Sequence, residues 1–398
     1  MSLQYSNALK TLVSEVVLNS KPLDKSNELF FKSIPAIKTH DKETLFHLIT
    51  FVIRYWITIH EIYKNLFSAR NIDFHEILHI QQILENHVEG RYICSGKYEK
   101  LVIDNYKLFS EVRHVRESFP KWLDNVCFKE LGAEWDLIAK TLNKKSEPIL
   151  RVNTLKTNLQ EVIFRMNASG KNVTSIDGYS DAVRVKKYFD IFRSEEFQSG
   201  FFEMQDAGSQ KIAPFLDAEA GMRVIDACAG NGGKTLHLSA LMKNKGKIIA
   251  LDIAPYKLEV LKKRMKRAGA FNIETKSIDS HKIIKRLHNS ADRLLLDVPC
   301  SGTGVLKRNP DIKYHLSEEK LKSLYTTQQE ILERYSLMVN KNGLLVYSTC
   351  SILPSENQQQ IQSFLEKKQG SFELIEEKTI SPLNGFDGFY MAKLKRSQ

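Results

Sequence analysis

From about Gly200 onward, the chain alternates between strand-like and helix-like segments. Helices are expected in "KTLHLSALMK" and "YKLEVLKKRMKRAG", each of which follows a short apolar run. The segments that predict strands are residues 224–227, "GKIIALD", "IETKSID", "RLLLDVP" and "GLLVYSTC", with "GFYMAKLKR" expected as a final edge strand. Such alternation is typical of a mainly parallel sheet covered by helices, as in the Rossmann-like α/β folds.

Five chemically capable side chains fall at or just beyond the ends of these predicted strands. They are Asp226, Asp252, Asp279, Asp297 and Cys350. Ligands of open parallel sheets bind outside the carboxyl ends of the strands. We therefore expect these five residues to share one site.

The rest of the chain precedes this alternation and divides into two parts. Residues 1–140 carry apolar residues at three- and four-residue spacing, as in "LFHLITFVIRYWITIHEIYKNLF", which predicts an all-helical domain. Residues 145–200 predict a small α/β subdomain, with strands in "ILRVNTL", "NVTSI" and "AVRVKK" and a helix in "NLQEVIFRMNASG". Residues 201–398 would then form the third and largest domain.

Charge and hydropathy narrow the class of protein. The 398 residues carry a formal net charge of +11, which favours a polyanionic partner such as nucleic acid. No apolar run approaches the roughly 20 residues that a membrane helix needs, and the N-terminus lacks the apolar segment of a signal peptide. We expect a cytoplasmic protein with no membrane partner.

The five cysteines are widely spaced: Cys94, Cys127, Cys228, Cys300 and Cys350. Without a C-x-x-C pair they do not predict a zinc site, and no metal is expected. A disulfide would need an oxidising compartment. Burial as a small apolar side chain accounts for Cys94 and Cys127. Cys300 in "DVPCSGTG" and Cys350 in "YSTCSILPSEN" are different, because each lies just past an apolar run in a similar setting.

The glycine-rich turn "DACAGNGGKT" at residues 226–235 allows several interpretations. A phosphate-binding P-loop is excluded, because Cys228 stands where its first glycine is required. A dinucleotide fingerprint begins at Gly230 and Gly232, but Thr235 stands in place of its third glycine. A third possibility is an S-adenosylmethionine fold with a looser glycine loop, in which Asp252 holds the ribose hydroxyls and Asp279 faces the adenine. The fourth is a turn that only joins a strand to a helix.

Two cysteines near an S-adenosylmethionine site suggest one kind of chemistry. Carbon 5 of a pyrimidine is too weak a nucleophile to accept a methyl group unaided. A thiolate that adds to carbon 6 activates it, and a hydrogen bond or proton at ring nitrogen 3, for which Asp297 is well placed, assists the addition. The spacing does not decide which cysteine attacks, since DNA cytosine-5 methyltransferases use a Pro-Cys pair such as Pro299–Cys300.

Several ordered motifs between about residues 115 and 398 resemble the RsmB/Sun-type RNA (cytosine-5) methyltransferases. These are "FPKWL", "LRVNTLK", "MQDAGSQ", "DACAGNGGKT", "DVPCSGTGVLKRNPDIKY", "YSTCSILPSEN" and "DGFYMAKLK". The resemblance implies an S-adenosylmethionine-dependent methyltransferase that forms 5-methylcytosine, with Cys350 as nucleophile and Cys300 aiding product release. It also implies a cofactor-binding set of Cys228, Ala229, Gly230, Asn231, Gly232, Gly233, Lys234, Asp252, Asp279 and Asp297.

The chain departs from the family pattern at a few positions. Gly230 and Asn231 replace the Ala and Pro of the usual C-A-A-P-G-G-K loop, and Val298 replaces a common Ala. The loop backbone is therefore expected to differ locally while the cofactor stays the same.

The resemblance also suggests partners. It implies small-subunit (16S) ribosomal RNA as the substrate of a monomeric enzyme; the alternatives are transfer RNA, or an inactive relative that serves as an RNA-binding assembly factor. The helical region resembles, without matching motif by motif, the NusB-like RNA-binding domain of bacterial members, and its alternative role is packing or partner binding. Residues 145–200 resemble the small RNA-handling insertion of the family. "KRNPDIKY" is the candidate for contacts with RNA phosphates.

Overall fold

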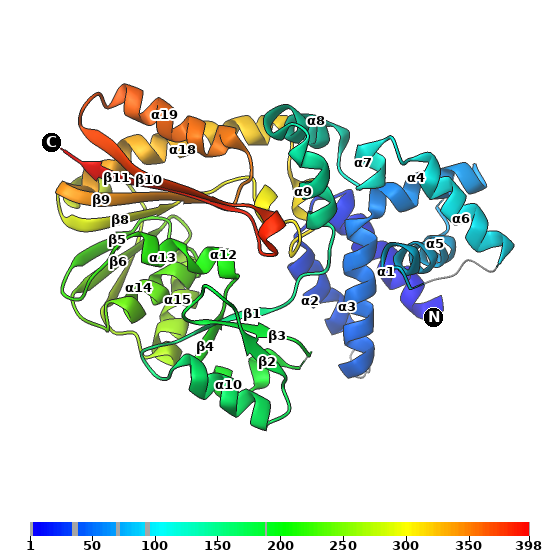
Figure 1. The fold of residues 1–398 in the computed structure, drawn as a ribbon, viewed down its shortest axis with the longest axis horizontal. Coiled ribbons are helices and arrows are strands. Elements are labelled where there is room, and N and C mark those ends of the chain that lie inside the picture. Colours follow the sequence, from blue (N-terminus) through cyan, green and yellow to red (C-terminus); the bar gives the residue numbers. More distant parts are fainter. Residues whose placement is uncertain (1–2, 34–38, 69–71, 92–95, 188, 398) are drawn as a thin grey trace. The chain divides into compact units, whose positions relative to one another are not determined.

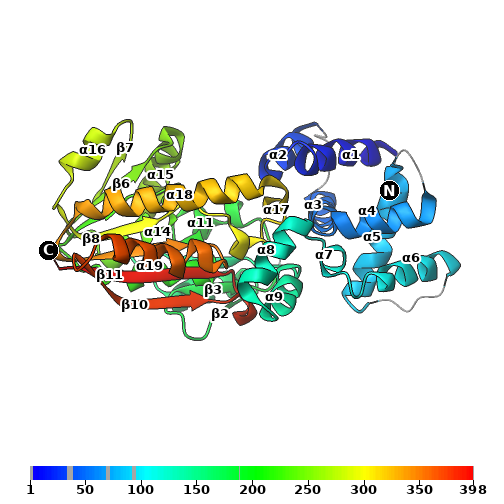
Figure 2. The same ribbon diagram turned by 90° about the horizontal axis from the view of Figure 1, so that it is seen from above.

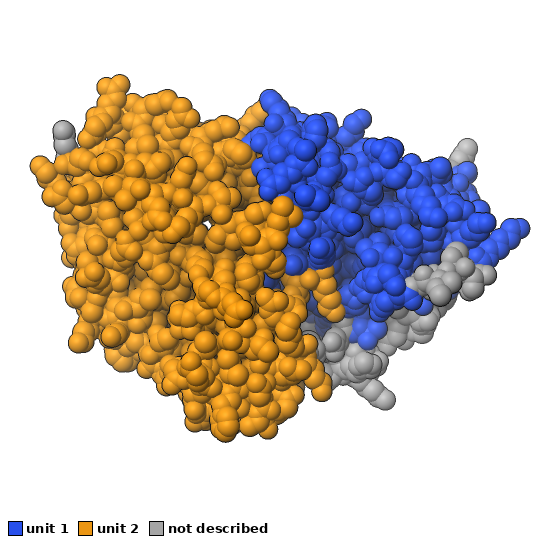
Figure 3. All heavy atoms as spheres, in the orientation of Figure 1, with its two compact units in different colours: residues 1–144, 305–320 blue, residues 145–304, 321–398 orange. Residues whose placement is uncertain are grey.

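The computed structural model describes the chain except for residues 1–2, 34–38, 69–71, 92–95, 188 and 398 (Figure 1). The chain divides into two compact units (Figure 3). Residues 1–144 and 305–320 form the first, here called the helical unit, and residues 145–304 and 321–398 form the second, here called the sheet unit. The sequence patterns did not predict that residues 305–320 would return to the first unit.

The helical unit is built around one apolar core, to which α1 to α6 contribute side chains such as Ile49, Ile59 and Leu84. Cys127 is buried, as expected, whereas Cys94 lies outside the described residues. The helices of this unit are α1 (Leu3–Val17), α2 (Leu23–Ser33), α3 (Thr39–Arg54), α4 (Trp56–Phe67), α5 (Phe74–Val88), α6 (Lys97–Leu108), α7 (Arg113–Arg116), α8 (Lys121–Leu131), α9 (Glu134–Leu142) and α17 (Ile312–His315).

The long apolar run that predicted a helix is broken at Tyr55 into α3 and α4, which are bent by 75°. Within the described residues, no single helix is long and apolar enough to cross a membrane; this bent pair reaches that length and composition only when its two helices are taken together.

Residues 305–320, here called the docked segment, complete two helices of the helical unit. The Asp311 carboxylate accepts a hydrogen bond from the backbone N–H of Leu23 at the start of α2 (3.0 Å). At the end of α3, Lys313 Nζ donates to the carbonyl oxygen of Arg54 (2.6 Å). The terminal N–H and C=O groups of a helix have no partner within the helix, and they favour an anion and a cation respectively. The docked segment therefore supplies caps that α2 and α3 do not contain themselves.

This arrangement corrects the expectation that "KRNPDIKY" contacts RNA phosphates, at least for its second lysine. Lys313 is 2% exposed, and its Nζ also donates to the carbonyl oxygen of Ser118 (2.5 Å). Burial, together with the charge of Arg54, lowers the pKa of Lys313 well below its ordinary value. A buried amine that already holds two carbonyl oxygens is not accessible to a phosphate.

The sheet unit begins with a small antiparallel sheet of order β2-β3-β1-β4. Its strands are β1 (Ile149–Val152), β2 (Val173–Ser175), β3 (Ala182–Val185) and β4 (Phe202–Met204), and α10 (Leu159–Ala168) packs on it. The first three strands and α10 confirm the predicted elements. The sequence patterns did not reveal β4, which pairs with β1 and lies beyond the predicted boundary at residue 200.

The large sheet has seven strands in the order β10-β11-β9-β8-β5-β6-β7. The strands β5 to β9 pair in parallel, as predicted. β11 pairs antiparallel with both of its neighbours, β9 and β10. Their bounds are β5 (Arg223–Asp226), β6 (Lys247–Asp252), β7 (Ile273–Ser277), β8 (Ala291–Asp297), β9 (Val339–Thr349), β10 (Phe372–Ile380) and β11 (Phe389–Arg396).

The prediction that "GFYMAKLKR" forms the edge strand was wrong. This segment is β11, which lies between β9 and β10, and β10 is the edge strand. The sequence of β10, "FELIEEKTI", is largely exposed and charged, so it lacks the apolar pattern by which buried strands are recognised. Charged residues are a common means of protecting an exposed sheet edge.

Helices cover both faces of the large sheet (Figures 1 and 2). On one face α16 (His281–Arg286), α18 (Glu318–Tyr335) and α19 (Gln358–Lys367) share a core with residues such as Ile225, Leu296 and Tyr347. On the other face lie α13 (Ile212–Phe215), α14 (Gly233–Leu241) and α15 (Pro255–Ala268). This layered α/β arrangement confirms the predicted Rossmann-like fold.

Candidate active site

The loops that follow β8 and β9 bring Cys300 and Cys350 together. The two strands are parallel neighbours, with Asp297 opposite Ser348, so the residues just beyond them meet at one edge of the sheet. The two sulfur atoms are 3.3 Å apart, and the backbone N–H of Cys350 donates to the sulfur of Cys300 (3.3 Å). Both are free thiols, because a disulfide has its sulfurs only about 2.05 Å apart.

The carboxylate of Glu356 ties the two cysteine motifs to each other. It accepts hydrogen bonds from the backbone N–H (2.8 Å) and the hydroxyl (2.5 Å) of Ser301, and it is fully buried. Gln328 of α18 donates both to this carboxylate (2.9 Å) and to the carbonyl oxygen of Pro299 (3.0 Å). The loop of the Pro-Cys pair is therefore held rigidly. Although "PSEN" belongs to a recognised motif, sequence analysis gave no role to Glu356.

An ion pair lies beside the cysteines. Lys234 Nζ is 2.5 Å from Oδ2 of Asp297, whose Oδ1 accepts a hydrogen bond from the Ser348 hydroxyl (3.0 Å). Burial by itself would lower the pKa of Lys234, but the carboxylate of Asp297, with the Cys350 sulfur as a weaker contributor, raises it. Lys234 is therefore a stable cation close to a potential thiolate. It was assigned to cofactor binding by sequence, whereas the structure shows its contact with Asp297.

A hollow of about 720 Å³ opens at the carboxyl ends of β5, β6 and β8. Five of the predicted site residues line it: Cys228, Gly230, Asp252, Asp279 and Asp297. Of the five side chains that the strand ends indicated, Asp252, Asp279 and Asp297 line this hollow, whereas Asp226 and Cys350 do not.

Ala229 and residues 231–234 of the glycine loop do not line the hollow. Ala229 is buried, and its N–H donates to the carbonyl oxygen of Leu251 (2.9 Å). Gly232 adopts a left-handed conformation (φ +84°) directly before α14, and a Cβ there would lie 2.1 Å from a methyl carbon of Leu261, so only glycine fits. These residues shape the loop rather than line the hollow.

Burial changes the chemistry of two groups in this region. It raises the pKa of the Cys228 thiol well above its ordinary value, with Asp226 adding to the effect, so Cys228 stays protonated. It also raises the pKa of Asp226 to about 7, against the opposing effect of a hydrogen bond donated by the Thr235 hydroxyl (2.7 Å). Asp226 is thus a buried carboxyl beneath the loop, and Cys228 lines the hollow as a neutral thiol.

One wall of the hollow was missed by sequence analysis. It is formed by one face of α18, whose contributing side chains recur at three- and four-residue spacing: Thr327, Glu330, Ile331, Arg334 and Tyr335. The spacing marks a helix face, but nothing in the sequence indicates that this face turns toward Asp252, which is more than seventy residues earlier.

A second hollow of the sheet unit, of about 620 Å³, combines cations with aromatic rings. Lys211 Nζ lies 3.9 Å from the centre of the Tyr179 ring, and Lys393 Nζ lies 4.6 Å from that of Phe215. Lys378 also lines this hollow, which we call the lysine groove. Two carboxylates partly neutralise the groove, through ion pairs of Lys393 with Asp217 (2.6 Å) and of Lys378 with Glu376 (2.6 Å).

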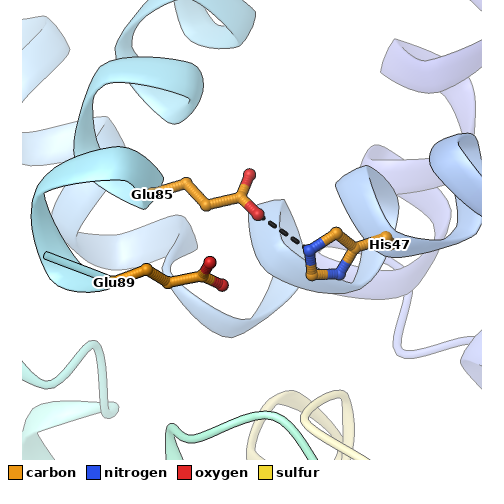
Figure 4. Close-up of side chains that lie close together, drawn as sticks. All are labelled: His47, Glu85 and Glu89. Atoms are coloured by element: carbon orange, nitrogen blue, oxygen red, sulfur yellow. Dashed lines mark ion pairs between the residues drawn. The ribbon is translucent and has the colours of Figure 1, made fainter. Parts of the chain in front are cut away.

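One group in the helical unit has the composition of a metal site. His47, Glu85 and Glu89 bring their ligand atoms within 4.8 Å of one another (Figure 4). These atoms already have partners: His47 Nε2 pairs with Glu85 (2.8 Å), and Arg91 forms ion pairs with both glutamates. We assign no metal-binding role to this group.

Together, the parallel sheet, the glycine loop and the acidic residues at the strand ends define an S-adenosylmethionine-dependent methyltransferase. Residues 213–395 match the family model described as 16S rRNA methyltransferase RsmB/F, and residues 119–192 match that of the RsmF/B-like ferredoxin-like domain. The chain belongs to the RsmB/F methyltransferase family.

Curated relatives carry related names. The chain is 34% identical over 262 residues to the probable ribosomal RNA small subunit methyltransferase B of Bacillus subtilis, and 31% identical over 326 residues to its counterpart of Synechocystis. These matches cover 66% and 77% of this chain. They span 58% of the length of the Bacillus protein and 72% of that of the Synechocystis protein.

Solved structures share the fold. The crystal structure of PH0851 superposes with a TM-score of 0.80 at 24% identity and covers 98% of this chain and 99% of its own. A methyltransferase homolog from Pyrococcus horikoshii has a TM-score of 0.63 at 27% identity over 72% of this chain and 98% of its own. The first likeness thus extends over both units.

Proposed function

We propose that the protein methylates carbon 5 of a cytosine in small-subunit ribosomal RNA, with the Cys350 thiolate adding to carbon 6. The observation that carries the proposal is the pair of free thiols 3.3 Å apart, beside the ion pair of Lys234 and Asp297. A nitrogen or oxygen methyltransferase needs no thiol nucleophile. Two thiols at adjacent strand ends are what formation and release of a covalent RNA adduct require.

The hollow fits S-adenosylmethionine in size and chemistry. Its volume of about 720 Å³ lies in the usual range for small-molecule sites. Asp252 already accepts backbone hydrogen bonds from Gly230 and Ala254 (2.8 Å each). A carboxylate has about four lone-pair positions, so Asp252 retains acceptors for two ribose hydroxyls. The apolar wall of Ile253, Ile278 and Ile331 suits an adenine ring. When bound there, the cofactor supplies an electrophilic methyl group.

The two cysteines differ in a way that supports their proposed roles. The hydrogen bond with Cys350, together with burial, raises the pKa of the Cys300 thiol well above its ordinary value. Cys300 therefore keeps its proton and can donate its S–H toward the Cys350 sulfur. The Cys350 sulfur thus has an S–H donor 3.3 Å away and the Lys234 cation near it. After methyl transfer, water takes the carbon-5 proton, the electrons of that C–H bond form the double bond between carbons 5 and 6, and the Cys350 sulfur leaves carbon 6 with its electron pair. Cys300 assists this release by donating its S–H as a hydrogen bond to the leaving Cys350 sulfur.

In this proposal, Asp297 and Lys234 act on the edge of the cytosine that carries the exocyclic amine and ring nitrogen 3. The carboxylate of Asp297 can accept a hydrogen bond from the exocyclic amine of cytosine, which uracil lacks. The Lys234 ammonium, 2.5 Å from Asp297, can donate a hydrogen bond toward ring nitrogen 3 as the thiolate adds. This pair would select cytosine and activate it at the same time.

The lysine groove supports contact with RNA outside the reacting base. Single-stranded RNA is bound by cations along its backbone and by aromatic faces on which bases stack. Lys211 and Tyr179 offer both in one place. We infer that this groove binds a part of the RNA other than the reacting base.

Bisulfite mapping of total RNA from cells with and without the gene tests the proposal. Loss of one protected cytosine in small-subunit ribosomal RNA is expected. Loss of a protected cytosine in a transfer RNA would change the proposed substrate but not the proposed reaction. An unchanged map would contradict the proposed activity.

A further inference from the structure

Two arginines to which sequence analysis gave no role, Arg151 of the small sheet and Arg264 of α15, hold the glycine loop. Arg264 of α15 donates from Nη1 to the carbonyl oxygen of Asn231 (2.7 Å). Arg151 of β1 donates from Nη1 to the carbonyl oxygen of Gly233 (2.6 Å) and is 2% exposed. Two guanidinium groups thus hold two carbonyl oxygens on either side of Gly232.

A buried carboxylate of the small sheet orients Arg264. Glu203 of β4 has a side chain that is only 4% exposed, and its Oε2 accepts from Nη2 of Arg264 (2.9 Å). Its Oε1 accepts from Nη2 of Arg267 (2.5 Å). Glu203 also lies directly opposite Arg151 in the pairing of β1 with β4. Arg151 and Glu203, a cross-strand pair of the small sheet, therefore both support the loop. Arg151 contacts Gly233 directly, and Glu203 orients Arg264, which contacts Asn231.

The glycine content of the loop explains why its conformation needs support from outside. Gly230 and Gly232 both adopt left-handed conformations, with φ of +54° and +84°. Glycine loses more conformational freedom on ordering than any other residue, so a loop of this composition is costly to fix in one shape.

Each held carbonyl fixes a peptide plane. The plane that joins Asn231 to Gly232 is held at both ends, because the N–H of Gly232 donates to the carbonyl oxygen of Ala229 (2.9 Å). The plane that follows Gly233 carries the N–H of Lys234, in the first turn of α14, where N–H groups have no acceptor within the helix. Arg151 therefore orients an N–H at the helix N-terminus and the residue that pairs with Asp297.

We propose that Arg264 and Arg151 are positioning residues for the cofactor, which keep the glycine loop in its binding shape from the small sheet. The proposal rests on the assignment of this loop to S-adenosylmethionine made above. It gives the small sheet a part in cofactor binding. Neither arginine lines the hollow, so each acts through the loop.

The test compares Arg264→Gln with Arg267→Gln by calorimetric titration of the full chain with S-adenosylmethionine. Both changes remove one ion pair with Glu203, and the two arginines are about equally exposed (21% and 19%). Only Arg264 contacts the loop. We expect Arg264→Gln to raise the cofactor Kd roughly five- to twenty-fold, the effect of one lost charge-assisted hydrogen bond, and Arg267→Gln to change it less than about two-fold.

Two further measurements separate positioning from general loss of structure. At saturating cofactor, kcat of Arg264→Gln should stay near the parent value while the cofactor KM rises. Amide hydrogen exchange should accelerate in residues 229–234 in Arg264→Gln and not in Arg267→Gln. Equal shifts of Kd in the two variants, or an unchanged Kd in Arg264→Gln, would overturn the proposal. If Asp252→Ala also leaves cofactor binding intact, the failure lies in the site assignment itself.

Discussion

The sulfur atoms of Cys300 and Cys350 are 3.3 Å apart, although fifty residues separate them in the chain. They meet because β8 and β9 are parallel neighbours whose carboxyl ends lie side by side. Glu356, which is fully buried, then fixes the loop of Cys300 through Ser301. The closeness of the thiols is thus a property of strand order and loop anchoring.

The two cysteines should behave oppositely when each is removed. Cys300→Ala retains the nucleophile but lacks the group that assists release, so it should accumulate a covalent protein–RNA adduct. Cys350→Ala should form no adduct and transfer no methyl group. A denaturing gel after incubation with RNA and S-adenosylmethionine distinguishes them, and the double variant is the control. A shifted band in Cys350→Ala alone would reverse the assignment of the roles.

Loss of Asp252 should weaken cofactor binding. Asp252→Ala removes the proposed acceptor of the ribose hydroxyls, at an expected cost of about 1–3 kcal/mol in binding free energy. Calorimetry with S-adenosylmethionine measures the change. The control is Asp177→Ala, which removes an exposed carboxylate from the turn between β2 and β3. An unchanged affinity in a folded Asp252→Ala protein would remove this residue from the site.

The buried carboxyl of Asp226 should make stability depend on pH. Its pKa is about 7 in the folded protein, against about 3.9 in an unfolded chain. Because folding favours the protonated form, its contribution is complete below about pH 4 and is lost as pH rises through about 7. Asp226→Asn mimics the protonated form. Its unfolding free energy, relative to the parent, should therefore increase by about 1–3 kcal/mol between pH 5 and pH 8. Urea unfolding at several pH values measures this, and parallel pH profiles would contradict the assignment.

Lys313 should matter for the helical unit and not for RNA affinity. Lys313→Met leaves the carbonyl oxygens of Arg54 and Ser118 without their donor, which should cost about 1–3 kcal/mol of stability. Its RNA affinity and salt dependence should equal those of the parent. Lys322→Met, which removes an exposed lysine, should leave stability unchanged. A lower RNA affinity of a stably folded Lys313→Met protein would restore the phosphate-contact hypothesis for this residue.

The lysine groove should contribute to RNA binding in a salt-dependent way. Lys211→Met should weaken RNA binding and reduce the slope of log affinity against log salt by about 0.7–0.9, the value of one phosphate contact. Tyr179→Ala should weaken binding without altering the slope, because stacking releases no counterions. Lys262→Met, on the exposed side of α15, is the matched control. Equal effects of Lys211→Met and Lys262→Met would exclude the groove as an RNA site.

The pattern of the chain was enough to predict the fold class, and it also supplied the candidates for the reactive groups. The alternation of strands and helices requires a parallel sheet, and the chain direction alone places Asp226, Asp252, Asp297 and Cys350 at its carboxyl edge, since parallel strands end on the same side. Local patterns carry this information because strand and helix periods are read within ten to twenty residues.

The tertiary structure alone decided which distant groups meet. The pairing of Lys234 with Asp297, the α18 wall of the hollow, and the contact of Arg264 with the glycine loop join residues 33 to 80 or more positions apart. The docked segment is a further example of a contact that local sequence patterns do not predict. The sequence suggests that Lys313 is a surface cation, but in the structure it is buried and caps the end of α3. Such contacts follow from the packing of whole elements, which minimises exposed apolar area and unpaired polar groups together. No local pattern records which partner satisfies a given group.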